Sequence, residues 1–520
     1  MKSQGIVETH KEQLKELLDY IMDKGYFTAD DIQKAKLMFA RNYRWGNLPR
    51  NSELISLIEK DDKYVDVLKK KPTRTLSGST PVAVMTSPAD CPHGKCIFCP
   101  GGTDNNSPQS YTGYEPAAMR GKNNDYDPFM QVTTRIEQYE SIGHPSDKVD
   151  IIVMGGTFIS RNKEYTDYFI KGIYDGLNGT VSESLKKAIN MNEVAVHRCI
   201  GMTMETRPDY SFEEHIKKMV SYGTTRVEIG VQSVYNDVLS FVKRGHTVED
   251  SIKATQLLKD AGLKVSYHMM PGLPGVDRER DIASLIKIIE EESFMPDMVK
   301  IYPLLVMKGT VLYEMWQRKE YIPPDIDDIV SIIAEFKSKV PPWLRIQRIQ
   351  RDIPSNLIDV GIKKSNLRQI VGEYMKANNM QCNCIRCREA GRRATHGEIK
   401  IKTVEYDASK GKEFFISFED DSSLHAYVRL RFPYHTFMPE HDEDTALIRE
   451  LRVVGVSAPI GKQGIIQHKG LGSKLMEEAE RISKSYGYRN ISVTSGVGVR
   501  EYYRKLGYSL KGNYMIKELK

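Results

Sequence analysis

Three cysteines stand close together near residue 91. Cys91, Cys96 and Cys99 lie in "CPHGKCIFCPGG", separated by four and then by two residues. Clustered thiolates bind zinc or an iron–sulfur cluster, and such a cluster normally takes four protein ligands. Plant-type ferredoxins share this opening spacing. Because the next cysteine, Cys199, comes 100 positions later, a cluster held here would keep one iron open to a small molecule. A zinc knuckle that closes a loop is the alternative.

A second cysteine triplet follows near residue 382. In "CNCIRCRE" the spacing is one and then two residues, which favours a structural zinc site over free thiols. The sequence leaves the fourth ligand open between His396, Cys199, solvent and a distant residue. The neighbouring arginines would present positive charge to a polyanion. The residues concerned are Cys382, Cys384 and Cys387, with Arg386, Arg388, Arg392 and Arg393.

A third chemical signal is a glycine-rich stretch near the C-terminus. "QHKGLG" spans 467–472 between an apolar strand pattern, "LIRELRVVG", and an amphipathic helix pattern. Backbone N–H groups exposed by glycine at a helix N-terminus can bind an anion such as a pyrophosphate. The later segment "ISVTSGVGVREYYRKLGY" carries two adjacent tyrosines, Tyr502 and Tyr503. Core packing is the alternative role for at least one of them.

Short apolar runs must position this chemistry. From residue 81 they alternate with helix-length polar stretches, which predicts βα units around a parallel sheet or open barrel. The chemistry of such folds collects at the carboxyl ends of the strands, where "GGT", "ETRPD", "GVQS" and "HMMPGLPG" stand. The runs are "PVAVMT", "VDIIVMGGT", "HRCIGMTMET", "TRVEIGVQS", "KVSYHMMPG" and "MVKIYPLL".

The distribution of apolar, basic and cysteine residues along the chain predicts four regions. Residues 1–80 read as a helical, basic region, and 81–340 as a partial (βα)6 barrel. Residues 341–397 form a basic linker with the cysteine-rich site, and 398–520 a smaller α/β domain. A length of 520 residues suits several domains.

Charge and composition narrow the class of protein. The chain carries a net charge of +6, but residues 343–402 alone contain 13 Lys/Arg and 5 Asp/Glu, so the remainder carries −2. A local excess of this kind suits a polyanion such as a nucleic acid, or else an ordinary solvated face. No apolar run reaches the length of a membrane span. With seven cysteines in two triplets and one isolated residue, we expect a cytoplasmic protein whose thiols bind metal.

The first triplet and the strand ends together resemble the radical S-adenosylmethionine (SAM) superfamily. There a cluster with an open iron binds SAM and releases a 5′-deoxyadenosyl radical; the common first gap is three residues rather than four. The resemblance implies a 4Fe-4S cluster on Cys91, Cys96 and Cys99. It implies SAM contacts at Gly155, Gly156, Thr157, Glu205, Arg207 and Gln232.

The C-terminal pattern resembles the GNAT acetyltransferases. "QHKGLG" matches Q-x-x-G-x-G, and the tyrosine pair matches the place where that family puts a tyrosine near the sulfur of CoA. The expected fold is therefore a radical SAM barrel followed by a GNAT-type α/β domain.

The combination resembles the catalytic subunit of the Elongator complex and its stand-alone relatives, with the compact cysteine spacing of the archaeal type. The resemblance runs from about Lys71 to the C-terminus. It is carried by "CPHGKCIFCPGG", "SYTGYEPAAMR", "IVMGGTF", "ETRPDY", "GVQSVYNDVL", "MPGLPG", "CNCIRCRE", "RELRVVG", "QHKGLG" and "YYRKLGY".

The family resemblance implies a reaction on the wobble uridine of tRNA. A 5′-deoxyadenosyl radical takes hydrogen from the methyl group of acetyl-CoA, the carbon radical adds to uracil carbon 5, and thioester hydrolysis leaves a carboxymethyl group. Lys148, Tyr502 and Tyr503 are the implied catalytic residues. Acetyl-CoA contacts are implied at Lys148, Glu450, Leu451, Arg452, Val453, Gln467, Gly470, Leu471, Gly472, Ser473 and Tyr503.

The expected partners are tRNA and an external electron donor, with a homodimer left open. From the distribution of charge, we expect tRNA to bind the basic N-terminal region 1–80 and the linker arginines Arg386, Arg388, Arg392 and Arg393. Two other functions compete with this one. A protein lysine acetyltransferase would work without SAM or a cluster, and a tRNA-binding scaffold would keep both domains as relics. The second is disfavoured because the glycine stretch, the tyrosines and the cysteine triplet are all present.

Overall fold

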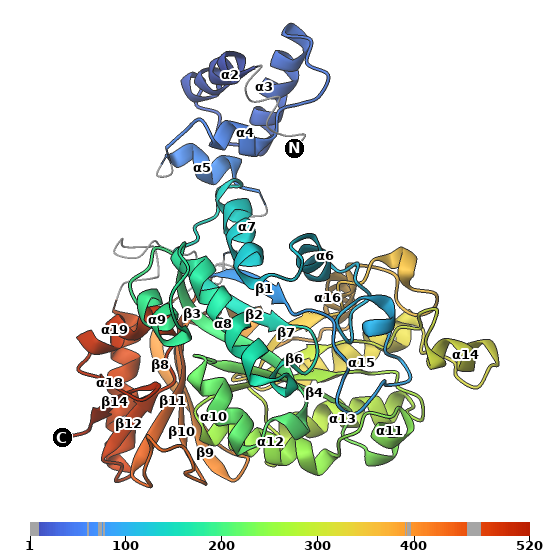
Figure 1. Ribbon diagram of the computed structural model, residues 1–520, viewed down its shortest axis with the longest axis vertical. Helices are drawn as coiled ribbons and strands as arrows, with labels where there is room; N and C mark the ends of the chain where they lie inside the picture. Colours follow the sequence, from blue (N-terminus) through green and yellow to red (C-terminus); the bar gives the residue numbers. More distant parts are fainter. Residues whose placement is uncertain are drawn as a thin grey trace.

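A computed structural model describes residues 10–59, 62–70, 75, 78–390, 392, 397–454 and 470–520. Figure 1 shows a large body made of two sheets with their helices, and a small helical region that stands away from it. No helix among these residues is both long and apolar enough to cross a membrane.

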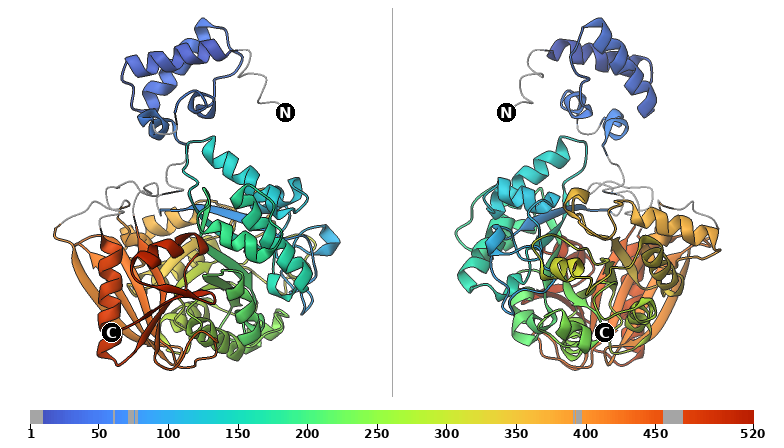
Figure 2. Two further views of the ribbon diagram at one scale, coloured as in Figure 1. Left: turned by 60° about the vertical axis from the view of Figure 1, so that its left-hand side comes forward. Right: turned by 90° about the vertical axis from the view of Figure 1, so that its right-hand side faces the viewer.

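The described residues of the small region form four helices around a core of their own. They are α2 (Lys11–Asp23), α3 (Ala29–Asn42), α4 (Asn51–Ile55) and α5 (Lys63–Leu68). Leucines at helical spacing on α2, such as Leu14, Leu17 and Leu18, bury one face, as an amphipathic helix requires. The region joins the body near the end of α7 (Pro128–Glu140), where Lys70 O lies 2.7 Å from His144 Nε2 (Figure 2).

The first sheet contains seven parallel strands in chain order. They are β1 (Thr80–Met85), β2 (Lys148–Met154), β3 (Arg198–Thr206), β4 (Arg226–Gln232), β5 (Lys264–Met269), β6 (Met298–Ile301) and β7 (Arg345–Ile349). All six expected strands are present. The seventh lies in the segment expected as a linker, where isoleucines recur at every third position among Arg and Gln residues. That segment also contains α16 (Leu367–Ala377) and α17 (Ile385–Arg388), so it completes the barrel sheet as well as linking domains.

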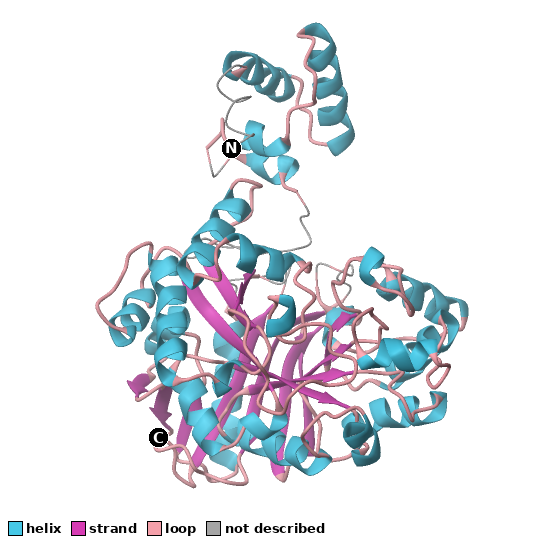
Figure 3. Cartoon of the chain, turned by 45° about the vertical axis from the view of Figure 1, so that its right-hand side comes forward, coloured by secondary structure: helices cyan, strands magenta, loops and turns pink. Residues whose placement is uncertain are grey.

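Helices cover the outer face of this open barrel (Figure 3). Val149, Ile151 and Val153 of β2 are fully buried against them, while the alternate residues face inward and are half-buried, as the two-residue period of a strand requires. The main helices after α7 are α8 (Lys163–Asn178), α10 (Glu213–Ser221), α12 (Val248–Asp260), α13 (Arg278–Glu290) and α15 (Ile326–Lys339). The shorter ones are α6 (Pro116–Asn123), α9 (Leu185–Asn192), α11 (Asn236–Phe241) and α14 (Val311–Gln317).

The second sheet has the order β13-β14-β12-β11-β10-β9-β8. Its strands β8 (Lys400–Ala408), β9 (Gly411–Glu419), β10 (Leu424–Phe432) and β11 (Thr445–Val453) are antiparallel, whereas β11 and β12 (Asn490–Val493) are parallel. The parallel pair is connected through α18 (Leu471–Ser485). The chain ends with α19 (Arg500–Lys505), β13 (Ser509–Lys511) and β14 (Tyr514–Glu518).

The two sheets share a buried interface. Arg449 of β11 donates to both carboxylate oxygens of Asp297 at 2.7 and 2.6 Å, and Arg431 of β10 donates to Asp260 at 2.6 Å. Trp343 stacks on Tyr406 with ring centroids 4.5 Å apart. These contacts fix the second sheet against the amino ends of the barrel strands.

Candidate functional site

A pocket opens at the carboxyl ends of the barrel strands. Its walls come from the loop after β1 and from the ends of β2 to β6, including Thr157, Glu205, Gln232 and His268. Cys91, Cys96 and Cys99 all line it. The first triplet and the strand-end residues expected to act with it therefore surround one space.

Two cysteines of the first triplet, Cys96 and Cys99, are buried, and each has a nitrogen-bearing side chain near its sulfur atom. Cys96 Sγ lies 3.2 Å from His93 Nε2, and Gln109 Nε2 donates to Cys99 Sγ at 3.4 Å. Burial raises the pKa of the Cys91 and Cys99 thiols, so a bound metal is needed to hold them as thiolates.

The spacing of these sulfurs does not suit a single ion. Two thiolates on one zinc, each about 2.3 Å from the metal, lie within about 4.6 Å of each other. Among the described residues, the sulfurs of Cys382, Cys384 and Cys387 all lie within 4.8 Å of one another, whereas those of Cys91, Cys96 and Cys99 do not. The wider first triplet therefore fits a larger group such as an iron–sulfur cluster better than a zinc knuckle.

Two glycines bring the end of β2 close to this triplet. Gly155 and Gly156 have φ angles of +128° and +90°, a region that favours glycine. A Cβ on Gly155 would lie 2.0 Å from Thr86 Oγ1, and one on Gly156 would lie 4.0 Å from Cys91 Sγ. Bare backbone at Gly156 therefore faces the pocket beside the cysteines, next to Thr157, whose Oγ1 lies 4.0 Å from Cys91 Sγ.

The other residues expected to contact SAM have different environments. Glu205 accepts a hydrogen bond from Tyr111 Oη at 2.6 Å. Gln232 has a φ of +67°, and its buried Oε1 has no hydrogen-bond partner in the described part of the chain, so this oxygen is an available acceptor in the pocket wall. Arg207 lines the pocket, but it is buried and donates to Asp209 and to the carbonyl oxygen of Arg244. These contacts give Arg207 a structural part in holding the pocket wall.

Several polar residues of the pocket were not predicted from the sequence. Glu228, His268 and Lys300 lie on β4, β5 and β6, and His268 Nε2 is 2.9 Å from Glu228 Oε2, which Lys300 also contacts. The charges of Lys300 and His268 outweigh burial and hold the pKa of Glu228 below its usual range. Polar residues at every second position of an otherwise apolar strand could have identified these residues from the sequence, because alternate side chains of a strand point to the same face.

A second hollow lies between the barrel and the C-terminal domain. The barrel contributes the amino ends of β2 to β5, including Lys148, and the C-terminal domain contributes Glu450 to Val453 and Gly470 to Ser473. Gly470 has a φ of +79° and precedes the first residue of α18, so the helix N-terminus faces the cleft. This cleft brings together the described residues that were expected to contact acetyl-CoA; Gln467 lies outside the described residues.

The tyrosine pair also lines this cleft. Tyr503 is 6 % exposed and Tyr502 is 38 % exposed, with ring centroids 5.2 Å apart. Burial raises the pKa of Tyr502 to about 12 and that of Tyr503 further, so both hydroxyls keep their protons at neutral pH. Burial also lowers the pKa of Lys148.

The pocket and the cleft lie at opposite ends of the same strands. Lys148, in the cleft, is the first residue of β2, and Met154, in the pocket, is its last. Six residue steps along a strand span about 20 Å. The carboxyl ends of the strands, which the sequence analysis singled out, therefore form the cysteine-lined pocket. The fold places the second site, the cleft, at the amino ends of the same strands.

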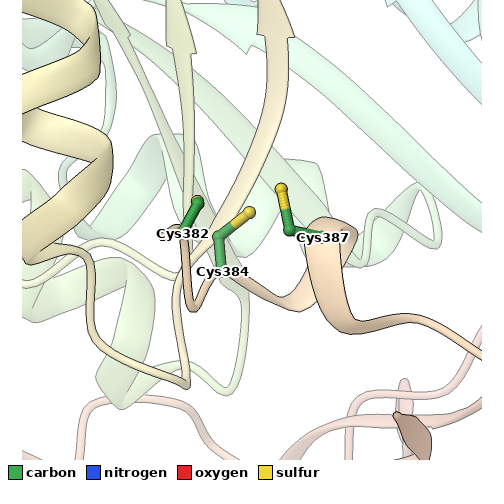
Figure 4. A group of neighbouring side chains, drawn as sticks. All are labelled: Cys382, Cys384 and Cys387. Atoms are coloured by element: carbon green, nitrogen blue, oxygen red, sulfur yellow. The ribbon is translucent and has the colours of Figure 1, made fainter. Parts of the chain in front are cut away.

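The second triplet forms a compact group beside β7. Cys382, Cys384 and Cys387 gather their side chains in one place (Figure 4). Hydrogen bonds from Cys382 and Cys387 hold the pKa of Cys384 well below its usual value. Cys199 is not part of this group: its sulfur lies on β3 in the core, where it donates to Gly201 O at 3.4 Å. His396 lies outside the described residues.

The arginines expected to face a polyanion differ in exposure. Arg388 donates to Glu419 at 2.7 Å and to the carbonyl oxygen of Pro342, and its side chain is 13 % exposed. The guanidinium of Arg388 therefore connects this segment to β9 and to the chain before β7, and little of it is exposed to solvent. Arg386 is part-buried, and Arg392 lies 3.3 Å from Glu389 Oε2 with a side chain 28 % exposed. Arg393 lies outside the described residues.

Four family models match successive parts of the chain. They are the ELP3 N-terminal domain over 6–76, the radical SAM superfamily over 86–286, the radical SAM C-terminal domain over 296–377 and the GNAT acetyltransferase family over 385–508. The third covers β7 and α16, in agreement with the barrel extending into the expected linker.

Whole-length relatives match as well. A tRNA uridine(34) acetyltransferase of Methanocaldococcus jannaschii is 52 % identical over 94 % of this chain and 94 % of its own length. Elongator complex protein 3 of Homo sapiens is 44 % identical over 94 % of this chain and 93 % of its own length. The solved structure of Methanocaldococcus infernus Elp3, with an N-terminal deletion, superposes with a TM-score of 0.77 at 48 % identity, covering 85 % of this chain and 100 % of that one.

Proposed function

The chain belongs to the family of the archaeal tRNA uridine(34) acetyltransferases and Elongator complex protein 3, and from this membership we propose that it modifies the wobble uridine of tRNA. The product is uridine carrying a carboxymethyl group on carbon 5, and the methyl carbon comes from acetyl-CoA. The observation that carries the proposal is that one barrel bears a cysteine-lined pocket at one end and the GNAT cleft at the other.

In this proposal the strand-end pocket binds the cluster and SAM. Cys91, Cys96 and Cys99 hold the cluster, and the backbone at Gly155, Gly156 and Thr157 binds SAM, together with Glu205 and Gln232. Arg207, which lines the same pocket, is proposed to contact SAM as well. When bound, a cluster with SAM supplies one-electron chemistry that can remove hydrogen from an unactivated carbon. The residues of this chain orient SAM and bury the reacting centre away from solvent.

The cleft binds acetyl-CoA in the same proposal. Backbone N–H groups from Gly470 to Ser473 face the pyrophosphate, and the edge of β11 from Glu450 to Val453 pairs with the pantetheine arm. Gln467, three positions before Gly470 in the sequence, is proposed to contact acetyl-CoA as well. Lys148, with its lowered pKa, holds water beside the thioester. Either tyrosine hydroxyl, Tyr502 Oη or Tyr503 Oη, can give a proton to the sulfur that leaves.

The cysteine triplet at Cys382, Cys384 and Cys387 is proposed to hold a structural zinc ion. The compact sulfur spacing supports it, because a tetrahedral zinc ion binds clustered cysteine sulfurs. A reducing cytoplasm keeps such thiols free of disulfides, and we propose that the protein works there with an external electron donor.

The tRNA is proposed to lie over the basic segment near Arg386, Arg392 and Arg393 and along the N-terminal helices. Replacing Arg392 and Arg393 by glutamate should weaken tRNA binding and reduce its dependence on salt, because fewer counterions are then released. Fluorescence titrations at several salt concentrations measure both effects. Affinity equal to that of the unchanged protein would exclude this segment as a contact.

An anaerobic reconstitution tests the function as a whole. The protein, loaded with iron and sulfide, is incubated with SAM, a reductant, tRNA and acetyl-CoA labelled in its methyl group, and the nucleosides are analysed by mass spectrometry. Label is expected in uridine at position 34, and Cys96→Ser should abolish it. Label in protein lysines, equally strong in Cys96→Ser and absent from uridine, would instead identify a lysine acetyltransferase.

A further inference from the structure

The loop that carries the first cysteine triplet has an outer side as well as a pocket side. The three cysteines and Phe98 line the strand-end pocket, whereas residues 92–95 do not. Most of that stretch is exposed, including Lys95. His93 is half-buried, and its Nε2 lies 3.2 Å from Cys96 Sγ. One half-buried side chain thus lies between a cysteine sulfur and the outer side of the loop.

The ends of two helices border this outer side. Just after α11, Val242 O accepts a hydrogen bond from Ile97 N at 3.2 Å, and Ile97 O accepts one from Leu312 N of α14 at 2.9 Å. The side chains of these three residues are buried in one hydrophobic cluster. A Cβ on Gly245 would lie 2.6 Å from His93 Cβ. The end of α11 and the start of α14 are therefore fixed against the cysteine loop, and both helices lie at the right-hand edge of the body in Figure 1.

Two apolar side chains are exposed where these segments meet. Phe241, the last residue of α11, is 54 % exposed, and Val311, the first residue of α14, is 49 % exposed. Each precedes a residue that is buried in the cluster with Ile97, so the backbone holds both at the edge of the cysteine loop. Because protein interfaces are enriched in aromatic side chains at their centre, this pair suits contact with another protein.

The charge beside these side chains is positive. Each of the three stretches that meet here carries an exposed lysine and no Asp or Glu. None of the three lysines forms an ion pair with a described residue. The stretches are 92–99, 241–246 and 308–313, and the lysines are Lys95, Lys243 and Lys308. Charge complementarity therefore favours an acidic partner.

A phosphate backbone is the other partner that such lysines could contact. It would gain nothing from covering an aliphatic side chain such as Val311, whereas a protein surface would bury that side chain and Phe241 away from water. We call these two residues and the three lysines the outer patch. Its mixture of exposed apolar groups and unpaired lysines favours an acidic protein over RNA.

We propose that an acidic one-electron carrier protein docks on the outer patch, from which His93 leads to Cys96 Sγ. This rests on the proposed function, which needs an electron from outside the chain. SAM takes the pocket side of the cysteine loop in that function, so a protein carrier has to approach from the outer side. The carrier loses one electron, the cluster gains it, and no bond forms or breaks in this step.

Binding of oxidised plant-type ferredoxin, an acidic one-electron carrier, tests the docking itself. Isothermal titration calorimetry with the full-length, reconstituted protein should show saturable binding that weakens as salt rises. Lys243→Glu/Lys308→Glu and, independently, Phe241→Ser should each weaken it at least tenfold. The control Lys484→Glu/Lys511→Glu changes the net charge equally at two exposed lysines of the C-terminal domain, and it should stay within twofold. No saturable binding, or equal affinity in every protein, overturns the proposal.

The rate of cluster reduction tests whether the docked carrier delivers its electron. In anaerobic stopped-flow measurements, reduction by reduced ferredoxin should fall at least tenfold in both patch variants, whereas reduction by dithionite, a small molecule, should stay within threefold. The affinity for tRNA should stay within twofold. Equal losses with both reductants overturn the proposal, and so does a tenfold loss of tRNA affinity with unchanged ferredoxin binding, which would assign the patch to RNA.

The calorimetric measurement is independent of turnover. If the unchanged protein puts no methyl label into uridine, the proposed function fails, and the binding of ferredoxin to the patch variants still decides whether the outer patch is its docking surface.

Discussion

The strongest test of how the two sheets are held together is Asp297→Asn. Asp297 is fully buried just before β6. Its two carboxylate oxygens accept from Arg449 at 2.7 and 2.6 Å, and Val265 N donates to it at 2.8 Å. Asparagine keeps the shape, but it removes the charge and turns one acceptor into a donor that faces the guanidinium of Arg449.

The expected cost follows from burial. Removing one partner of a buried ion pair destabilises a protein by about 3–5 kcal/mol, because the remaining charge loses its compensation. Asp444→Asn is the matched control: Asp444 also pairs with an arginine, Arg489, but the two side chains are 39 % and 77 % exposed. Solvent screens such a pair, so the control should cost less than about 1 kcal/mol.

Urea unfolding followed by tryptophan fluorescence measures the difference. Trp343 is buried at the interface, where it stacks on Tyr406, and it reports separation of the sheets. Acetyl-CoA affinity should fall as well, because Arg429 contacts Asp297 and also donates to Glu450 of the cleft at 3.0 Å. If Asp297→Asn and Asp444→Asn shift the urea midpoint equally, the interface is not held by this pair.

The same pair has a pH signature. Burial alone would raise the pKa of Asp297, but Arg449 and Arg429 outweigh it and hold the pKa below the usual value of 3.8. A depressed acid contributes stability that is present above its unfolded pKa and is lost as pH falls towards the folded pKa. The gap in unfolding free energy between the unchanged protein and Asp297→Asn should therefore narrow below about pH 4.

Three further outcomes are expected. Gly496→Ala should destabilise the domain interface and lower the urea midpoint, because its Cβ would lie 2.1 Å from the carbonyl oxygen of Ile200. The control is Gly372→Ala on α16, whose Cβ would meet nothing within 4 Å. It should be neutral or stabilising by up to about 1 kcal/mol. Burial raises the pKa of Asp281 to about 7, so about 2–4 kcal/mol of stability present at acid pH is lost as pH rises through 7. Asp281→Asn should therefore flatten the dependence of the unfolding free energy on pH between pH 5 and 8. An unchanged dependence contradicts the raised pKa. Cys384→Ser should release one equivalent of zinc measured by mass spectrometry of the metal, and equal metal content in both proteins excludes the triplet as its site.

Much of the local chemistry could be predicted from the sequence because it is encoded in short stretches. The six apolar runs correspond to β1 to β6. In each cysteine triplet and in the glycine turn at Gly470, the sulfur atoms or backbone N–H groups come from residues close together in the sequence. The strand β7 was missed because its charged residues, such as Arg345, are paired by distant partners. Arg345 contacts Glu389, which no local pattern reveals.

The sequence by itself determined the kinds of group present and the strands that carry them: thiols, glycine turns, tyrosines and a parallel barrel. Only the tertiary structure decided how they are distributed in space. Parallel strands give every barrel two distinct ends, and a residue's place along its strand decides which end it faces. Lys148 and Met154 share one strand but line different sites. The outer patch beside the cysteine loop exists because Val242 and Leu312, far apart in the chain, both bond to the backbone of Ile97, which depends on how the helices pack around the barrel.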